Sequence, residues 1–397
     1  MAMTRVLLTL FLFISIGLKA QWKQTTLNNQ AILCLYVYGS NLLAGTDGNG
    51  IFLSKDNGNN WSTGGLDTFQ IESIASIGSN LFAATVYYGV YLSTDSCKSW
   101  TAVNTGLSDW QVSSLAVVGK NLFVGTSTSV YISTNNGANW TSVNTGIWNH
   151  YANVFAVSGD SIFAGTASLG PSPGGGVFLS DNNGSNWVVD TSGIGNKVEL
   201  AIALNGKNLF VGTEGQGVFL STNSGSSWNP VNSGLGSNLI IGALKFNGND
   251  IFAGATKGVF LSSNNGMNWV YVGLDTLGID AFAIIGNNLF AGTWNKYGVF
   301  TAPLSSLTGI QEVQSSAVQF NIYPNPSSTH LTIQTFQSQD PVSIQLISLF
   351  GQKIYCSNPP VSPCYSIDVS SLPKAVYIVQ VLDIATGEVG SEKVVVK

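Results

Sequence analysis

Short apolar runs of four to six residues, separated by turns rich in glycine, asparagine and serine, recur along most of the chain. Residues 206–228 show the unit clearly: an apolar run at 208–213 precedes a second run at 217–221, and a polar turn then ends at Trp228. β-Branched and aromatic runs of this length predict strands, and the turn residues between them predict hairpins. The pattern therefore predicts an all-β protein built from antiparallel meanders.

The polar turn is an eight-residue box, Ser-x-Asp/Asn-x-Gly-x-x-Trp in most of its six copies. The copies are 54–61, 93–100, 133–140, 180–187, 221–228 and 262–269. Successive tryptophans are 39, 40, 47, 41 and 41 residues apart. A period of about 40 residues made of short strands is typical of the blades of a β-propeller.

The apolar run that precedes each box gives a second count of the blades. It occurs seven times, at 41–46, 80–85, 121–126, 161–166, 208–213, 250–255 and 288–293. The seventh copy has no box, because its next strand runs into Pro303, whereas Trp22 stands in the sequence context of a strand that follows a box. We therefore predict a seven-bladed β-propeller over residues 21–306, whose N-terminal strand completes the seventh blade and leaves no long sheet edge unpaired.

The inner strand of each predicted blade is mostly apolar. The runs at 32–37 and 112–118 are examples, and Ser113 and Ser114 are the polar exceptions in the second of them. Continuous apolar runs of this length indicate strands buried on both faces.

The boxes resemble those of the BNR or Asp-box repeat proteins, a group that includes sialidases, xyloglucan-active glycosidases and photosystem-assembly propellers. The resemblance covers residues 21–306 and implies the fold more than the function, because the box is structural wherever it occurs. In such a box the Ser and Asp/Asn side chains bond their own backbone, the Gly takes a positive φ, and the Trp packs against the next sheet. Cys97 replaces the Gly of the second box, which predicts a strained or differently shaped turn.

Residues 1–20 predict a secretory signal peptide. Arg5 precedes an apolar stretch over 6–18, and the chain turns polar at Gln21. The stretch is too short for a membrane span and has the wrong flanking residues. We expect no transmembrane segment in the mature chain.

After a polar linker at 307–318, the last 79 residues (319–397) contain six or seven short alternating apolar runs, which predict a small C-terminal β-sandwich, Ig-like in fold. This segment resembles the type A C-terminal sorting domain of proteins exported by the type IX secretion system of Bacteroidota. The matching motifs are Tyr-Pro-Asn-Pro at 323–326, Leu-Phe-Gly-Gln at 349–352, Ser-Leu-Pro-x-x-x-Tyr at 371–377 and the lysine-containing end, with Ala375 in place of the usual Gly. The resemblance implies the secretion machinery as a partner of 319–397, and a secreted protein or one attached to the outer-membrane surface.

Charge and cysteine content limit the classes of partner. Without residues 1–20 the chain loses Arg5 and Lys19, which leaves 13 of the 15 basic residues, all lysine, against 20 acidic residues and a net charge of −7. An acidic chain without arginine has little means of gripping phosphate backbones, so we expect no nucleic-acid partner. No Cys or His set has metal-ligand spacing, and we expect no metal and no cofactor.

The four cysteines divide into two kinds. Cys356 and Cys364 flank a hairpin-like loop in an exported protein, and we predict a disulfide between them. Cys34 on an inner strand and Cys97 in a box are expected to be free.

Acidic residues raise the question of catalysis. Sialidases hold the substrate carboxylate with three arginines, and a mature chain without arginine excludes that activity as far as the resemblance can. Glycoside hydrolysis needs only a pair of carboxylates about 5 to 10 Å apart. The candidates are Asp67, Glu72 and Asp109, which the predicted register places in loops at one end of neighbouring blades.

Aromatic residues outside the boxes favour a binding site instead. The register places Trp110, Trp148 and Trp294 at the same end of the blades as the acids, together with Tyr151 and Tyr297. Exposed rings beside amide groups suit a sugar or protein partner, although they could also plug the channel or cover neighbouring blades. The predicted function is therefore a non-catalytic binding or scaffold module for a polysaccharide or a surface protein. The alternative is a polysaccharide-active glycoside hydrolase that uses a loop carboxylate pair.

Overall fold

The computed structural model describes residues 22–147, 150–168, 175–190, 194, 199–237, 239–308, 320–335, 342–348, 353–357, 364–384 and 389–397. The chain divides into two compact units, Met1–Gly309 and Ile310–Lys397. The predicted signal peptide (1–20) and almost all of the predicted linker (307–318) lie outside the described residues.

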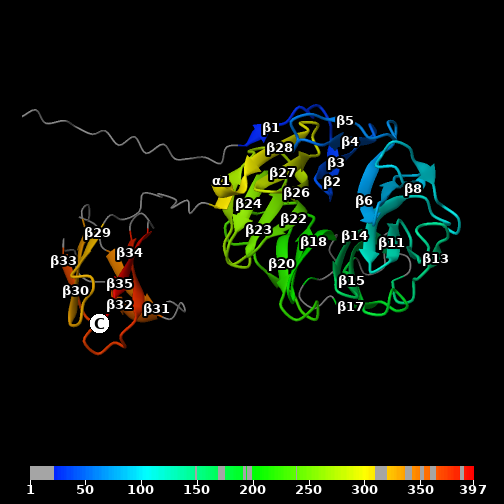
Figure 1. The fold of residues 1–397 in the computed structure, drawn as a ribbon. Coiled ribbons are helices and arrows are strands. Elements are labelled where there is room, and N and C mark those ends of the chain that lie inside the picture. Colours follow the sequence, from blue (N-terminus) through cyan, green and yellow to red (C-terminus); the bar gives the residue numbers. More distant parts are fainter. Residues whose placement is uncertain are drawn as a thin grey trace, which may run out of the picture. The chain divides into compact units, whose positions relative to one another are not determined.

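Seven four-stranded antiparallel sheets make up the described part of the first unit (Figure 1). Their inner strands are β2 (Ile32–Tyr38), β6 (Ile71–Ile77), β10 (Val112–Val118), β14 (His150–Ser158), β18 (Glu199–Asn205), β22 (Ile241–Asn247) and β26 (Ile279–Ile285). The second strands are β3 (Asn41–Thr46), β7 (Asn80–Thr85), β11 (Asn121–Thr126), β15 (Ser161–Ser168), β19 (Asn208–Thr213), β23 (Asp250–Ala255) and β27 (Asn288–Thr293).

The third and outer strands are shorter. The third strands are β4 (Ile51–Ser54), β8 (Gly89–Ser93), β12 (Val130–Ser133), β16 (Val177–Ser180), β20 (Gly217–Ser221), β24 (Gly258–Ser262) and β28 (Val299–Pro303), which leads into α1 (Leu304–Thr308). The outer strands are β5 (Ser62–Thr63), β9 (Thr101–Ala102), β13 (Thr141–Ser142), β17 (Val188–Asp190), β21 (Asn229–Pro230), β25 (Val270–Gly273) and β1 (Lys23–Gln24).

The first unit closes on itself in the way a propeller does. Each inner strand contacts the inner strand of the next sheet, and β26 contacts β2. The outer strand of the last sheet is the N-terminal strand β1, which pairs with β28 through Lys23↔Thr301 and Gln24↔Phe300. This pairing confirms the prediction that the N-terminal strand completes the sheet that lacks a box.

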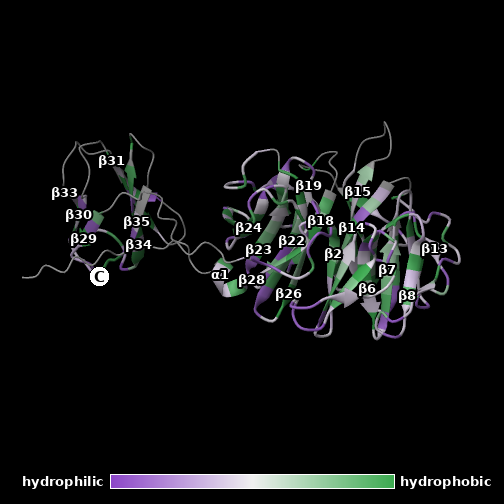
Figure 2. Ribbon diagram, turned by 90° about the horizontal axis from the view of Figure 1, so that it is seen from above, coloured by the Kyte–Doolittle hydropathy of each residue, from purple (hydrophilic) through white to green (hydrophobic). Residues whose placement is uncertain are grey.

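Tight contact between neighbouring sheets explains the glycine near the end of most second strands. A Cβ on Gly45 would lie 2.8 Å from the carbonyl oxygen of Ile71, at the start of the next inner strand. One phenylalanine per sheet in five of the sheets, for example Phe82 and Phe290, is fully buried between them. In Figure 2 hydrophobic colour follows the strands, and hydrophilic colour is common on the loops that join them.

The box turns are held by their own polar side chains. In the first box Ser54 Oγ accepts from the backbone N–H of Gly58 at 2.8 Å and donates to Asp56 Oδ1 at 3.0 Å, and the N–H of Asn60 donates to that carboxylate at 2.8 Å. Cys97 keeps this geometry, because its N–H donates to Ser93 Oγ at 3.0 Å with φ at +69°. The substitution therefore leaves the turn's shape intact and places a non-glycine residue at positive φ.

The box tryptophans contact the preceding sheet and not the next one as predicted. Trp140 Nε1 donates to the carbonyl of Val103 at 2.7 Å, directly after the outer strand of the sheet before it. Trp187 and Trp269 repeat this bond to Val143 and Val231. Trp22 Nε1 donates to Val272 at 2.8 Å in the same manner, so it takes the place of the missing seventh box tryptophan. The backbone N–H groups of Trp140 and Trp187 also donate to the carbonyls of Thr105 and Thr145, at 2.9 and 2.8 Å, so the end of each of these box turns lies against the preceding sheet.

The second unit contains two sheets around one apolar core. One sheet has the order β29 (Phe320–Tyr323), β30 (His330–Thr335), β33 (Cys364–Asp368), and the other has the order β32 (Lys353–Ser357), β31 (Val342–Ser348), β34 (Val376–Asp383), β35 (Val389–Val395). Leu331 and Ile333 from the first sheet share a buried cluster with Leu346 and Val379 from the second. This arrangement agrees with the predicted sandwich of short strands.

Candidate functional site

The two ends of the seven sheets differ in the loops they carry. Because the strands run antiparallel, the boxes and the turns between first and second strands share one end, which we call the box end. The hairpins between second and third strands and the connections into each next inner strand share the other end, which we call the loop end. Every inner strand begins at the loop end.

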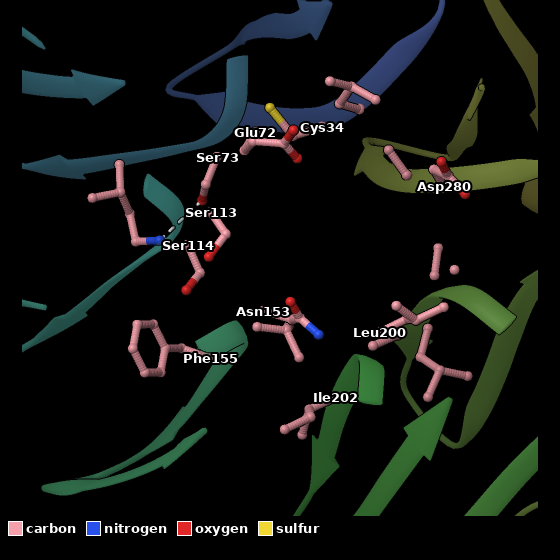
Figure 3. A pocket seen from close by; sticks show the side chains of 18 of the residues that line it. Cys34, Glu72, Ser73, Ser113, Ser114, Asn153, Phe155, Leu200, Ile202 and Asp280 are labelled. Atoms are coloured by element: carbon pink, nitrogen blue, oxygen red, sulfur yellow. Dashed lines mark hydrogen bonds between the residues drawn. The ribbon is translucent and has the colours of Figure 1, made fainter. Parts of the chain in front are cut away.

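All seven inner strands carry a β-bulge near their start, directly after the first residue in six of them and after the third residue, Ala152, in β14. A bulge leaves one residue without a partner in the ladder and re-aims its side chain. The unpaired residues are Leu33, Glu72, Ser113, Asn153, Leu200, Gly242 and Asp280, in sheet order. All seven line one cavity of about 430 Å³ on the axis of the unit, and we call them the bulge ring. Figure 3 shows Glu72, Ser113, Asn153 and Asp280 around this common space.

Glu72 is one of two acids in the bulge ring. Burial raises the pKa of its carboxyl group, the negative charges of Asp47 and Asp280 raise it further, and a hydrogen bond from Gln70 opposes them. Gln70 Nε2 donates to Glu72 Oε1 at 2.7 Å. Glu72 is therefore oriented by one amide and lies near two other carboxylates.

Asp280 is the second acid, and burial raises its pKa to about 6. Its carboxylate lies over Gly242, where an added Cβ would come within 2.5 Å of Asp280 Oδ1. Gly242 has no positive φ, so its backbone does not require glycine. The missing side chain provides the space in which the Asp280 carboxylate lies.

Two further titratable groups line the cavity. Burial, reinforced by the charge of Glu72, raises the pKa of the Cys34 thiol to about 12. The pKa of Tyr151 is also raised, chiefly by burial and then by Glu72, while hydrogen bonds with Gln111 and Ser113 oppose the shift. Near neutral pH both groups stay protonated and add no charge to the cavity, and the Cys34 thiol donates to the carbonyl of Ile71 at 3.7 Å.

Ser113 of the ring and its neighbour Ser114, which also lines the cavity, are already engaged. Ser113 Oγ donates to the carbonyl of Ala152 at 2.7 Å, and Ser114 Oγ donates to the same oxygen at 2.8 Å. They join the third and fourth inner strands and retain acceptor capacity toward the cavity.

The three acids proposed from the sequence do not line one site. Asp67 is exposed, accepts from Thr63 Oγ1 at 2.5 Å and lines a separate groove between the first two sheets. Asp109 accepts from Ser127 Oγ at 2.7 Å and from the N–H of Gln111 at 3.0 Å. Burial acts to raise the pKa of Asp109, but these hydrogen bonds outweigh it and the pKa is lowered. The structure therefore groups Glu72 with Asp280, while Asp109 holds its own loop together.

The predicted aromatic residues are found mostly at the rim of the loop end. Trp110, Trp294 and Tyr297 are each 51% exposed. Tyr151 differs from them, because it lines the cavity and is only partly exposed. Trp148 lies outside the described residues, so its predicted role stays a prediction.

Sequence reasoning missed the bulge ring as a set. Glu72 was one of the candidate acids, and Ser113 stood out as a polar exception in an apolar strand, but Asn153, Gly242 and Asp280 were not singled out as a site. Each ring residue lies eight positions before the start of the second strand of its sheet, and aligning these positions would have identified the ring. That alignment shows Glu, Ser, Asn and Asp at four of the seven positions.

Among the described residues, no group of three or more His, Cys, Asp and Glu residues is arranged to hold a metal ion. None of the helices described there has the length and apolar character that crossing a bilayer requires. The predicted disulfide stays a prediction, because the side chain of Cys356 is outside the described part; Cys356 and Cys364 lie on strands of different sheets.

The last fifth of the chain matches a known family, the secretion system C-terminal sorting domain, over residues 321–397. Residues 321–397 are a sorting domain. This sorting domain marks the protein for type IX secretion and for a location at the cell surface or outside the cell, and it implies interaction with the secretion machinery. No curated protein matches the sequence.

Solved structures resemble the chain in fold. PorZ, a surface component of the type IX secretion system of Porphyromonas gingivalis, has 15% identity and a TM-score of 0.52; the match covers 91% of this chain and 59% of PorZ. YCF48 bound to D1 peptide has 15% identity and a TM-score of 0.57, with 71% of this chain and 96% of YCF48 covered. The GH74 xyloglucanase of Xanthomonas campestris has 13% identity and a TM-score of 0.58, with 80% of this chain and 59% of the enzyme covered.

These likenesses support a propeller-like fold and no more than that. The chain spans about three fifths of the length of PorZ and of the xyloglucanase. The neighbours include both a secretion component and a glycosidase, so their likeness does not choose between binding and catalysis.

Proposed function

We propose that the first unit is a seven-bladed β-propeller with Asp-box turns that acts as a non-catalytic binding or scaffold module after export. Its ligand is a glycan or a surface protein, and it binds at the loop end. The sorting domain, Ig-like in this proposal, serves export. The observation that carries the proposal is that Trp110, Trp294 and Tyr297 each keep half of their surface exposed at that end. Large exposed rings on an otherwise well-packed domain are typical of interaction sites.

The bulge ring supports binding at the same end. Its four polar members face one cavity at the centre of the loop end, and Cys34 and Tyr151 beside them stay protonated near neutral pH. A few convergent polar groups in a partly apolar cavity can orient a ligand. Trp148 and Tyr151 belong to the proposed site by their register.

The test is a binding and hydrolysis screen of the full chain. Plant, algal and host polysaccharides and surface-protein extracts are scored by retention and by the release of reducing ends. We expect retention without new reducing ends, and weaker retention in a Trp110→Ala, Trp294→Ala double variant. Met267→Ala is the matched control, because Met267 is 69% exposed in a box turn at the opposite end. Equal loss in the control, or no loss in the double variant, would place binding elsewhere.

The second candidate is a polysaccharide-active glycoside hydrolase. The observation that favours it is the pairing of Glu72 with Asp280 in one cavity, both with raised pKa values. A carboxyl group kept protonated by its surroundings can donate a proton to a leaving group while a neighbouring carboxylate assists. Reducing-end release that disappears in Glu72→Gln and Asp280→Asn, but persists in Asp67→Asn and Asp109→Asn, would establish this candidate. If reducing-end release is lost only in Asp67→Asn or Asp109→Asn, the catalytic acids are instead those proposed from the sequence.

A further inference from the structure

The loop-end rim is built from a repeated joint between neighbouring sheets. A glycine N–H from the hairpin of one sheet donates to the carbonyl of the residue two positions before the inner strand of the next sheet. The joints are Gly298 to Gln30 at 2.9 Å, Gly50 to Phe69 at 3.0 Å and Gly89 to Trp110 at 3.0 Å. Residues at the joints therefore occupy equivalent places on successive sheets.

Aromatic residues gather at these joints over the last sheet and the first three. Phe69 and Trp110 accept the joint bonds, Tyr88 and Tyr297 directly precede the donor glycines, and Trp294 and Tyr87 lie in the same hairpins. Between the two aromatic groups lies an amide pair, in which Asn49 Nδ2 donates to Gln30 Oε1 at 2.9 Å. We call this set the rim arc; it comprises Trp294, Tyr297, Gln30, Asn49, Phe69, Tyr87, Tyr88 and Trp110.

The rings of the rim arc are held in place while much of their surface stays open. Tyr88 stacks on Phe69 with ring centroids 4.7 Å apart and planes 16° apart, and it is still 50% exposed. The Trp294 indole lies against Gly278, where an added Cβ would collide with it, and half of its surface is exposed. Packing on one face with the other face open is the geometry of a stacking platform.

The conformation of Tyr87 does not stabilise the fold. The equivalent hairpin positions in the first and fifth sheets are Gly48 and Gly215, with φ of +89° and +83°. Tyr87 adopts φ of +73° at this position and is 67% exposed. A bulky residue at positive φ is strained, and here the side chain gains almost no burial in return.

The chemistry of the arc favours an uncharged, extended ligand. Its members are aromatic or amide residues without formal charge. Rings stack on the C–H face of a sugar and amides bond its hydroxyl groups, whereas the backbone donors at the joints are already used and cannot pair with a peptide strand. Stacked sheets lie about 10 Å apart, so an arc over four sheets spans at least about 20 Å, which exceeds one sugar ring.

We propose that the rim arc binds a neutral polysaccharide chain lengthwise, with several sugar units in contact. This inference rests on the proposed binding function and names its ligand class and its site. Tyr88, Trp110 and Trp294 are stacking residues, Gln30 and Asn49 contact hydroxyl groups, and Tyr87 extends the surface of the second sheet.

The test uses the full chain and three neutral hexasaccharides, cellohexaose, mannohexaose and laminarihexaose, with the disaccharide of each series. Binding is followed by tryptophan fluorescence and calorimetry. We expect at least one hexasaccharide to bind, its disaccharide to bind about tenfold more weakly, and Tyr88→Ala or Trp110→Ala to weaken the hexasaccharide by about tenfold. Met267→Ala should bind as the wild type does.

Tyr87→Gly separates binding from folding. This variant places glycine where the first and fifth sheets have it, so we expect a higher Tm together with weaker hexasaccharide binding. If a hexasaccharide binds the arc variants as tightly as it binds the wild type, the rim arc is not the binding site. The proposed binding function is not contradicted by that result. Binding of a surface protein with no binding of any hexasaccharide overturns the glycan ligand alone. A chain that binds neither overturns both.

Discussion

The Asp280 carboxylate occupies the space that a side chain at residue 242 would fill, and glycine there allows it. An added Cβ on Gly242 would come within 2.5 Å of Asp280 Oδ1 and 3.0 Å of the Ile279 carbonyl oxygen. The two residues sit at the bulges of neighbouring inner strands, β22 and β26, so the spatial relation depends on the packing of the sixth sheet against the seventh.

Gly242→Ala should destabilise the protein. The new methyl group displaces a buried carboxylate and crowds the backbone, and overpacking of this kind costs about 1 to 3 kcal/mol. Thermal unfolding of Gly242→Ala, Asp280→Ala and the double variant measures the coupling. We expect the double variant to lose less than the sum of the single changes, because removing the carboxylate relieves the nearest contact. Simple additivity would contradict the contact.

Asp280 should make stability depend on pH. Its pKa is raised from 3.8 to about 6 by burial, so between these values the folded state binds more protons than the unfolded state. The contribution is fully present below about pH 4 and is lost as the pH rises through 6, on the order of 3 kcal/mol. Asp280→Asn should flatten the fall in the free energy of unfolding between pH 4 and 7. An identical slope in the variant would contradict the assignment.

Ser54→Ala should weaken the first box turn without affecting ligand binding. Buried Ser54 Oγ accepts from Gly58 and donates to Asp56, and removing it leaves a buried N–H unpaired at a cost of about 1 to 3 kcal/mol. Chemical denaturation gives the loss. Ser62→Ala is the control, because Ser62 is exposed and its hydroxyl makes a bond of only 3.4 Å. Equal losses in the free energy of unfolding for both substitutions would contradict the structural role of the box serine.

The cysteines should react in two classes. Burial raises the pKa of Cys34 to about 12 and that of Cys97 to about 11, and a thiol without thiolate is a poor nucleophile. Both should resist alkylation at pH 8 until the protein is unfolded. Cys356 and Cys364 should appear as one linked peptide pair in a non-reducing digest, and their alkylation without reductant would refute the disulfide.

Deleting residues 319–397 should trap the protein in the periplasm. The sorting domain lies within these residues, and its removal takes away the part that the secretion machinery reads. Surface labelling and fractionation of cells measure the effect, with Trp110→Ala in the full chain as an export-competent control. Unchanged surface display of the truncated chain would contradict the prediction.

Because the sequence repeats, the strands of the first unit could be predicted from the sequence at the level of their residue ranges. The predicted second strands agree with the observed ones, for example at 41–46 and 208–213, because local turn chemistry and apolar runs set each hairpin. The pairing of the N-terminal strand with the last sheet was also predicted, since Trp22 carried the context of a missing repeat. The direction of the tryptophan contacts was wrong, because an indole's partner depends on which neighbouring sheet its turn approaches.

The sequence by itself determined the strands, the repeat, the closure and the export domain, since each depends on residues close together or on a pattern repeated along the chain. Tertiary structure alone decided which polar groups meet. Glu72 and Asp280 are about two hundred residues apart in sequence, and only the return of the seventh sheet to the first brings both to one cavity. Asp67, only five residues from Glu72, lines a different groove. When the sheets close into a ring, equivalent positions on distant repeats come to lie close together. A local sequence pattern does not contain that information.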